Sequence, residues 1–299
     1  MSGPLISAVG LSHSPQMSED TELVQGLVFR ETYAHVVSAV RQFDPTLVFY
    51  FGPDHLRALT GVAPCFTVVE SATGYGDWGT PQEDYAVPSD LAVAVGQHLT
   101  ASGIDIAFAA HLRLDHGFGQ STSDLFGSLS AVPIVPIVVS CVDRPIPLAR
   151  RCAELGRAVG AFVRGGALDD SERVLFIGSG GLSHEPPSLV PGARDLDEEQ
   201  RRALITAAGA HAADALNPEW DQEFLGVLAG PQWQDLAALT VGDIAPGGAG
   251  GVEILTWIAA AFAADEPLRT VVYQPVEDWI TGMGIAVSSS LSVPEPHPV

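Results

Sequence analysis

The chain has 299 residues, of which 46% are hydrophobic, and its formal charge at pH 7 is −22. This composition permits a large core and argues against global disorder, and the negative charge argues against nucleic acid or an anionic membrane surface as a partner. Every basic residue is an arginine, which excludes lysine Schiff-base chemistry and a lysine-dependent phosphate loop.

Short apolar runs rich in β-branched residues alternate with longer helix-like segments. In chain order the pattern predicts strand Leu5–Val9, helix Thr21–Phe43, strand Leu47–Phe51, helix Ser89–Ala101, strands Ile104–Ala109 and Ile134–Val139, helix Leu148–Arg164, strand Val174–Ile177, and helices Asp197–Asp214 and Gly251–Ala263. This alternation is typical of an α/β fold, a single layered domain whose mostly buried mixed sheet is flanked by helices. We expect a catalytic domain over residues 1–287 and a loose tail over residues 288–299.

Three histidines each follow a predicted strand that ends in glycine. LISAVG leads to His13, LVFYFG leads to His55, and VLFIGSGG leads to His184. In open α/β sheets the active crevice lies outside the carboxyl ends of the strands, so we expect these side chains to converge there. A fourth histidine, His116, stands between aspartate and glycine, which disfavour a helix interior, and is therefore expected in a loop.

The loop around His13 recurs around His184. GLSHSP occupies residues 10–15 and GLSHEP occupies residues 181–186. The two histidines could be a pair of metal ligands. Alternatively, one could hold a metal while the other acts on what the metal binds.

A metal site needs a suitable set of donors. Two neutral histidines and one carboxylate on one face of an octahedron leave three positions open, which suits a non-haem Fe(II) that binds substrate and dioxygen together. The candidate carboxylate is Glu253, at the start of an apolar helix, where it could instead only complement the helix dipole. Asp54 and Asp115, each beside a histidine, are candidates for orienting an imidazole ring by accepting its second N–H.

A serine hydrolase is a competing hypothesis, because Ser12 and Ser183 each precede a histidine. The chain has no GxSxG nucleophile motif, and adjacent loop residues usually point apart, so these are poor nucleophile–base pairs. A metal-dependent hydrolase and a non-catalytic metal-binding protein remain further alternatives.

Several motifs together resemble the class III extradiol ring-cleaving dioxygenases, closest to the 3-(2,3-dihydroxyphenyl)propionate 1,2-dioxygenase branch. They are LSHSP (11–15), PDH (53–55), DHGF (115–118), GSGGLSH (178–184) and VEILTW (252–257), together with LNPEWD (216–221) and PVEDWITGMG (275–284). The resemblance covers nearly the whole chain, and the motifs occur in the order found in the family.

The resemblance implies Fe(II) as the cofactor, with His13, His55 and Glu253 as its ligands. It implies that His184 is the base that deprotonates the bound catechol and that His116 is the acid of a later step. The implied substrates are a substituted catechol and O2, in aromatic compound catabolism. The two similar loops would then differ in role, since the first holds the metal and the second acts on the substrate.

The motifs specify the reaction more closely than they specify the substituent on the substrate ring or the oligomeric state. The segment between Pro187 and Leu216 is shorter than in the propionate-cleaving enzymes, so an aminophenol or another substituted catechol remains an alternative. Arg57 or Arg113 could pair with a substrate carboxylate, although we expect both on the surface. The three unpaired cysteines and the absence of a signal-like N-terminus predict a cytoplasmic protein, and we expect a homo-oligomer.

Overall fold

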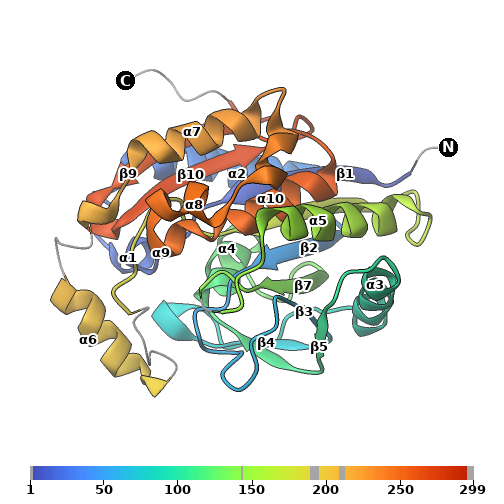
Figure 1. Cartoon of the computed structure of the whole chain (residues 1–299), viewed down its shortest axis with the longest axis horizontal. Coiled ribbons are helices and arrows are strands. Elements are labelled where there is room, and N and C mark those ends of the chain that lie inside the picture. Colours follow the sequence, from blue (N-terminus) through green and yellow to red (C-terminus); the bar gives the residue numbers. More distant parts are fainter. Residues whose placement is uncertain (1–2, 143, 189–194, 209–212, 295–299) are drawn as a thin grey trace.

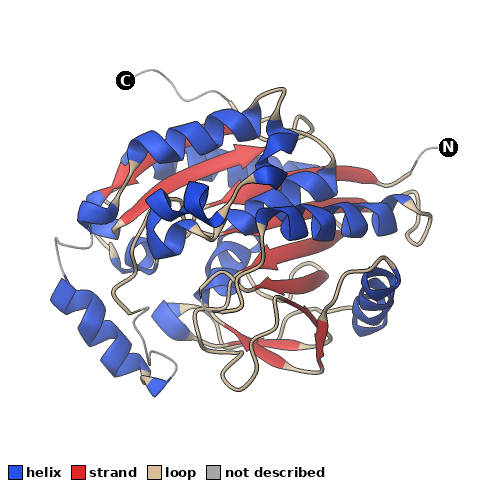
Figure 2. Ribbon diagram, viewed as in Figure 1, coloured by secondary structure: helices blue, strands red, loops and turns tan. Residues whose placement is uncertain are grey.

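A mixed sheet of eight strands forms the centre of the molecule (Figures 1 and 2). The computed structural model describes residues 3–142, 144–188, 195–208 and 213–294. The strands of the sheet are β1 (Leu5–Leu11), β2 (Leu47–Gly52), β3 (Phe66–Val69), β5 (Ala107–Ala109), β7 (Ile134–Val139), β8 (Arg173–Ser179), β9 (Arg269–Val276) and β10 (Thr281–Val287). Their spatial order is β5-β3-β7-β2-β8-β1-β10-β9, and the central four, β7, β2, β8 and β1, run parallel.

Helices cover both faces of the sheet, which confirms the predicted α/β architecture. Helices α3 (Ser89–Ala101), α5 (Ala149–Arg164), α7 (Pro218–Ala229) and α10 (Ile254–Ala264) pack on one face, and α2 (Leu27–Phe43) and α4 (His116–Phe126) pack on the other. Along β2, Phe49 and Phe51 point to the first face, and Val48 and Tyr50 point to the second. A continuous apolar run is therefore required, because each successive side chain enters a core.

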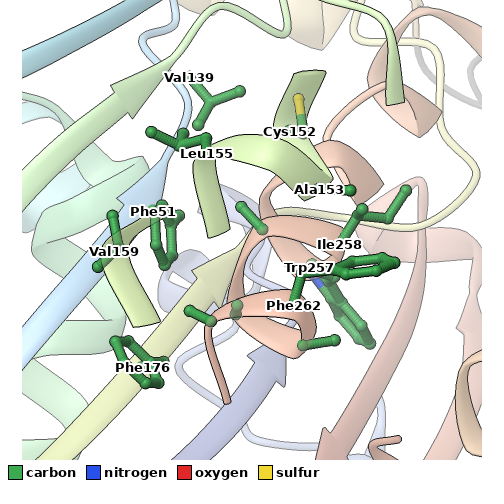
Figure 3. Packing of buried hydrophobic residues seen from close by; sticks show 14 of the residues in the cluster. Phe51, Val139, Cys152, Ala153, Leu155, Val159, Phe176, Trp257, Ile258 and Phe262 are labelled. Carbon is green, nitrogen blue, oxygen red and sulfur yellow. The ribbon is translucent and has the colours of Figure 1, made fainter. Parts of the chain in front are cut away.

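Helix α10 is buried on every side between α5 and the sheet (Figure 3). Small residues allow this close packing, since a Cβ on Gly156 of α5 would lie only 2.2 Å from the carbonyl oxygen of Ala259. Within the described residues no single helix is long and apolar enough to cross a membrane, and one bent pair, residues 241–251 with 254–264, passes only when its two helices are taken together.

The remaining elements lie outside the central sheet and the helices that cover it. They are α1 (Pro15–Glu19), α6 (Glu198–Ala208), α8 (Val241–Ile244), α9 (Gly248–Gly251), the 3-10 turns Asp77–Gly79, Trp233–Ala238, Ala245–Gly247 and Glu277–Trp279, and a two-stranded sheet of β4 (Ala72–Gly74) and β6 (Leu112–Leu114). Helix α6 lies at the edge of the molecule (Figure 1).

Several predicted elements have different bounds. The helix expected from Thr21 begins only at Leu27, because Gly26 before it is in the left-handed region with φ of 60°. The strand expected from Ile104 begins at Ala107. The helix expected over 197–214 is observed as α6, Glu198–Ala208, whereas residues 213 and 214 lie in a 3-10 turn. Residues 209–212 of that prediction lie outside the described residues.

The expectation of a loose tail from residue 288 is wrong for the part that the structure describes. The Ser288 hydroxyl accepts the backbone N–H of Ala8 at 2.9 Å, and Leu291 and Val293 are buried. The chain therefore stays packed on β1 beyond the predicted boundary. Residues 295–299 of the predicted tail lie outside the described residues.

Strands β9 and β10 do not appear among the predicted elements, and the glycines of β10 explain why. Gly282 and Gly284 weaken the strand pattern, yet a Cβ at Gly282 would lie 2.2 Å from Asp221 Oδ2. Glycine here marks the close approach of a buried carboxylate to the strand. Asp221 in turn accepts the backbone N–H of Ser183 at 2.7 Å and so supports the loop before His184.

Replacing Gly282 by alanine is expected to lower the free energy of unfolding by about 1–3 kcal/mol, because the added methyl group overlaps the Asp221 carboxylate. Urea unfolding measures this change. The matched control is Gly226→Ala in α7, where a Cβ meets no atom within 4 Å, and this variant should gain about 0.5–1 kcal/mol. Equal stability of Gly282→Ala and the unchanged protein would contradict the packing described here.

Candidate metal centre

Four histidines and one glutamate meet at the carboxyl ends of three adjacent parallel strands. His13 follows β1, His55 follows β2, and His184 follows β8, which lies between those two strands. His116 is the first residue of α4, and Glu253 directly precedes α10. All five side chains are buried. The convergence predicted from the strand ends is confirmed, whereas the expectation of a loop at His116 is wrong, because Asp115 caps a helix that begins there.

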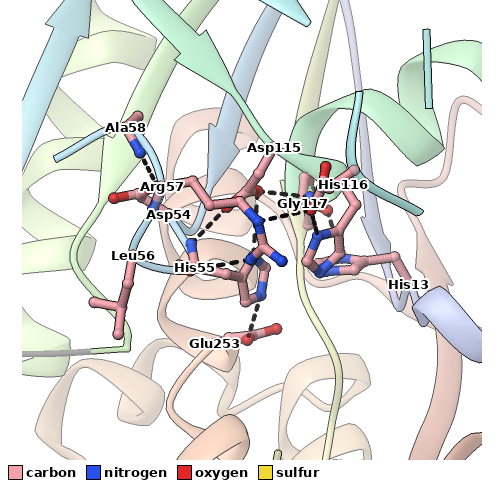
Figure 4. A network of polar contacts seen from close by, with 12 residues as sticks. His13, Asp54, His55, Leu56, Arg57, Ala58, Asp115, His116, Gly117 and Glu253 are labelled. Carbon is pink, nitrogen blue, oxygen red and sulfur yellow. Dashed lines mark hydrogen bonds and ion pairs between the residues drawn. The ribbon is translucent and has the colours of Figure 1, made fainter. Parts of the chain in front are cut away.

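The potential ligand atoms of this group lie close enough together to surround a single ion, and Figure 4 shows Glu253 directed at the His55 ring. Within the described residues, His13, His55 and His116 form a group whose potential ligand atoms all lie within 4.8 Å of one another. Glu253 Oε1 lies 3.1 Å from Nε2 of His55 and 3.8 Å from Nε2 of His184. Neighbouring ligand atoms of an octahedral ion with bonds of about 2.1 Å lie roughly 3 Å apart. Two ligand sets therefore fit, three histidines or two histidines with Glu253.

Each of the four rings has its Nδ1 atom against a protein oxygen. The oxygens are Asp115 Oδ1 for His55 (3.2 Å), Asp77 Oδ2 for His116 (2.5 Å), the Leu182 carbonyl for His184 (3.0 Å) and Ser179 Oγ for His13 (3.1 Å). Ser179 donates its own proton to the Gly117 carbonyl at 2.7 Å, so it accepts from His13. These contacts place a proton on each Nδ1 and leave Nε2 for a ligand or a proton in transit, as is usual for metal-binding histidines.

The glycine-rich segments bring Glu253 and His184 into contact distance. A Cβ on Gly250 would lie 2.1 Å from the His184 ring, and one on Gly180 would lie 2.5 Å from Cβ of Glu253. Oε2 of Glu253 accepts the backbone N–H of Gly181 at 2.8 Å, and the side chain makes no capping hydrogen bond to its own helix. The carboxylate is therefore directed at the histidines rather than at the helix end.

Burial and neighbouring charges set three pKa values in the group. Burial, opposed by Glu253 and reinforced by the other rings, lowers the pKa of His13 to about 3. Burial also disfavours a charged His55, but Asp115 and Glu253 outweigh it and raise its pKa to about 10. Burial opposes ionisation of Glu253, yet the hydrogen bond from His55 and the nearby rings lower its pKa to about 2. The two carboxylates that flank the His55 ring make the site favourable for a cation, because a metal ion can take the place of the proton on Nε2.

Asp115 orients a histidine ring, but that of His55 rather than that of its neighbour in sequence. Its Oδ2 also accepts the backbone N–H of His55 at 2.6 Å, and its Oδ1 accepts that of Gly117 at 2.9 Å. The prediction that Asp54 orients a ring is wrong. Its carboxylate accepts the backbone N–H groups of residues 57–59 and stabilises the turn after β2.

Asp77 is a site residue that the sequence did not indicate. Its buried carboxylate contacts Nδ1 of His116 and, at 3.0 Å, Nε of Arg57. It lies in a short 3-10 turn that no predicted strand precedes, so position alone gave no signal. The expectation that Arg57 lies on the surface is also wrong, because only 5% of its side chain is exposed.

A cleft of about 500 Å³, counting its open mouth, leads to the histidines. Its lining includes His13, His55, Arg57, Trp78, His116, His184, Ile205 and Ile280.

The serines beside the histidines are used elsewhere. Ser12 Oγ accepts the backbone N–H of Gly284 at 2.9 Å, and the Ser183 hydroxyl donates to Asp221 at 2.7 Å. Each hydroxyl thus supports the backbone of its loop, which does not favour a serine nucleophile at either position.

Comparison with known proteins identifies the family of this arrangement. Residues 7–284 match the family described as the catalytic LigB subunit of aromatic ring-opening dioxygenase. A protein of Photorhabdus laumondii named 2,3-dihydroxyphenylpropionate/2,3-dihydroxicinnamic acid 1,2-dioxygenase is 34% identical, over 94% of this chain and 96% of its own. Proteins of the same name from Rhodococcus sp (34%, covering 95% and 98%) and Cupriavidus necator (35%, covering 90% of each) are similar. The chain belongs to the aromatic ring-opening dioxygenase family of the catalytic LigB subunit.

Proposed function

We propose that this protein opens the ring of a substituted catechol beside its two hydroxyl groups, using O2 and an Fe(II) held by His13, His55 and Glu253. The observation that carries the proposal is the pairing of Glu253 with Nε2 of His55 inside a group of histidines whose Nδ1 atoms are all held by the protein. Two histidines and one carboxylate leave positions for both oxygens of a diol and for dioxygen. Bound Fe(II) would supply a shared attachment point for the two substrates and a path for electrons between them.

The two other histidines would move protons in this proposal. Nδ1 of His184 is held by the Leu182 carbonyl, so its Nε2 is free to accept a proton from a catechol hydroxyl. The Asp77 carboxylate accepts the Nδ1–H of His116 and fixes the orientation of that ring, whose Nε2 would pass a proton to oxygen during ring opening. Both rings line the same cleft, so base and acid reach one substrate.

The names of the relatives support a substrate such as 3-(2,3-dihydroxyphenyl)propionate. An aminophenol or another substituted catechol is the alternative substrate within the same chemistry. A homo-oligomeric assembly and a location in the cytoplasm stay predictions.

Reconstitution under anaerobic conditions with Fe(II), Mn(II) or Zn(II), followed by oxygen electrode traces with catechols and aminophenols, tests this proposal. We expect oxygen uptake and a coloured product only with a redox-active metal, and fastest with the propionate-substituted catechol. Hydrolysis consumes no oxygen, so a metal-loaded protein that releases product without oxygen uptake would instead be a metal-dependent hydrolase.

Replacing Asp77 by asparagine is expected to lower kcat by about 10–100-fold while the iron content stays close to that of the unchanged protein. The amide keeps the size of the side chain but replaces the carboxylate that accepts the Nδ1–H of His116 by a neutral, weaker acceptor. Single-turnover rates and iron analysis measure the two quantities. A variant with normal kcat would show that the Asp77–His116 pair has no part in proton transfer.

A further inference from the structure

Arg57 contributes a permanent positive charge to the wall of the cleft. Among the described residues that line the cleft, it is the single arginine, and the chain has no lysine. Its guanidinium is fixed beside the metal centre, because Nη1 donates to the carbonyl oxygen of His55 at 3.1 Å. In a protein of net charge −22, an anionic group that enters this cleft finds its favourable partner here.

The two carboxylates that pair with Arg57 differ in how firmly they are held. Asp77 is fully buried and also contacts His116. Glu198 has 31% of its side chain exposed, and both of its oxygens lie 2.8 Å from Arg57 nitrogens, in a forked pair. Asp77 therefore contacts the guanidinium of Arg57 from the protein interior, and Glu198 contacts it from the solvent side.

Helix α6, which carries Glu198, is attached through polar contacts. In its described residues 198–207, the single buried side chain is Arg201. Arg202 pairs with Glu19 at 2.6 Å and lies over the Trp78 ring at 4.2 Å. An exposed ion pair such as Arg202–Glu19 contributes little to stability. Because no apolar side chain in the described part of α6 is buried, moving the Glu198 carboxylate away from Arg57 exposes little apolar surface.

We infer that Arg57 binds a carboxylate on the side chain of the substrate and that Glu198 occupies this position until the substrate displaces it. The inference rests on the proposed function and deepens it, since the substrate class becomes catechols that carry a carboxylate on a short chain. The planar guanidinium binds a carboxylate through two parallel hydrogen bonds, the geometry that Glu198 shows. Exchange of one carboxylate for another leaves the charge around Arg57 unchanged.

The test compares 3-(2,3-dihydroxyphenyl)propionate with its primary amide, which has the same size and no charge. Values of kcat/KM for both compounds are measured with the Fe(II)-loaded protein and with Arg57→Gln, Glu198→Gln and Glu199→Gln. Arg57→Gln should lower the acid-to-amide ratio by about tenfold or more. Glu198→Gln should raise that ratio, mainly through a lower KM for the acid, because the competing carboxylate is gone. Glu199→Gln removes the same charge from an exposed neighbour on α6 and should leave the ratio unchanged.

Equal losses for acid and amide in Arg57→Gln would overturn the inference, because the arginine would then only support Asp77 and the loop of His55. An unchanged acid-to-amide ratio in Glu198→Gln would show that the substrate carboxylate does not displace Glu198 from Arg57. Anaerobic calorimetry with the same two compounds separates this inference from the proposed function. If the acid binds in an Arg57-dependent way and no oxygen is consumed, the anion site stands and ring opening fails. If both compounds are cleaved at equal rates, ring opening stands and the anion site fails.

Discussion

Replacing His13 by alanine is expected to remove bound iron and activity together, whereas replacing His116 by alanine should leave iron bound and stop turnover. Loss of His13 removes a ligand, and iron affinity should fall by more than about 100-fold, beyond the effect of losing a supporting residue. Loss of His116 removes a proton donor, and kcat should fall by about 10²–10⁴-fold. Iron per protein after anaerobic reconstitution and dialysis, measured beside kcat, distinguishes the two.

The control for both variants is His35→Ala, because His35 lies exposed on α2, outside the histidine group. The three-histidine ligand set gives the opposite pattern. If His116→Ala loses iron while Glu253→Gln retains it, the ligands are His13, His55 and His116, and the assignment of Glu253 is wrong.

Replacing Asp115 by asparagine should weaken both the fold and the metal centre. Burial opposes its charge, but His55 and the neighbouring cations hold the pKa of Asp115 well below its usual range. A lowered pKa contributes stability above the unfolded pKa of about 3.9, and this is lost as the pH falls through the lower folded value. At pH 7 the contribution is fully present, so the substitution should cost about 3 kcal/mol, as removal of one partner of a buried ion pair does.

The choice of asparagine isolates the charge, because asparagine also caps helices and can keep the bond to Gly117. Iron affinity should fall by about 10–100-fold as His55 loses the carboxylate that orients it. Guanidinium unfolding and competition with a metal chelator measure the two effects. Asp105→Asn, at an exposed position, serves as the control. Unfolding of Asp115→Asn at the same denaturant concentration as the unchanged protein would contradict the role of the carboxylate.

The sequence predicted the part of the site that depends on strand ends. His13, His55 and His184 follow buried parallel strands, and parallel strands place their carboxyl ends at one edge of a sheet. Asp77 and the contact partner of Asp115 could not be predicted in this way. The position of Asp77 and the pairing of Asp115 with His55 depend on how loops from outside the sheet fold over its edge. The spacing of residues along the chain does not reveal how these loops fold.

Local patterns failed where tertiary contacts override them. The position of Asp54 beside a histidine suggested that it orients a ring, but its oxygens accept the backbone N–H groups of the following turn. His116 between Asp and Gly suggested a loop, but the aspartate is a helix cap and the glycine allows close packing, with a Cβ there only 3.0 Å from the His55 ring. In each case the residue type indicated a polar role, but tertiary packing determined which group the residue contacts.

Ring opening is tested most directly by oxygen consumption of the Fe(II)-reconstituted protein with 3-(2,3-dihydroxyphenyl)propionate, measured against the amount of substrate opened. We expect one molecule of O2 consumed per molecule of catechol, a product opened beside the diol, and no uptake by His13→Ala. Iron bound at the site with no oxygen uptake on any catechol or aminophenol would contradict ring opening.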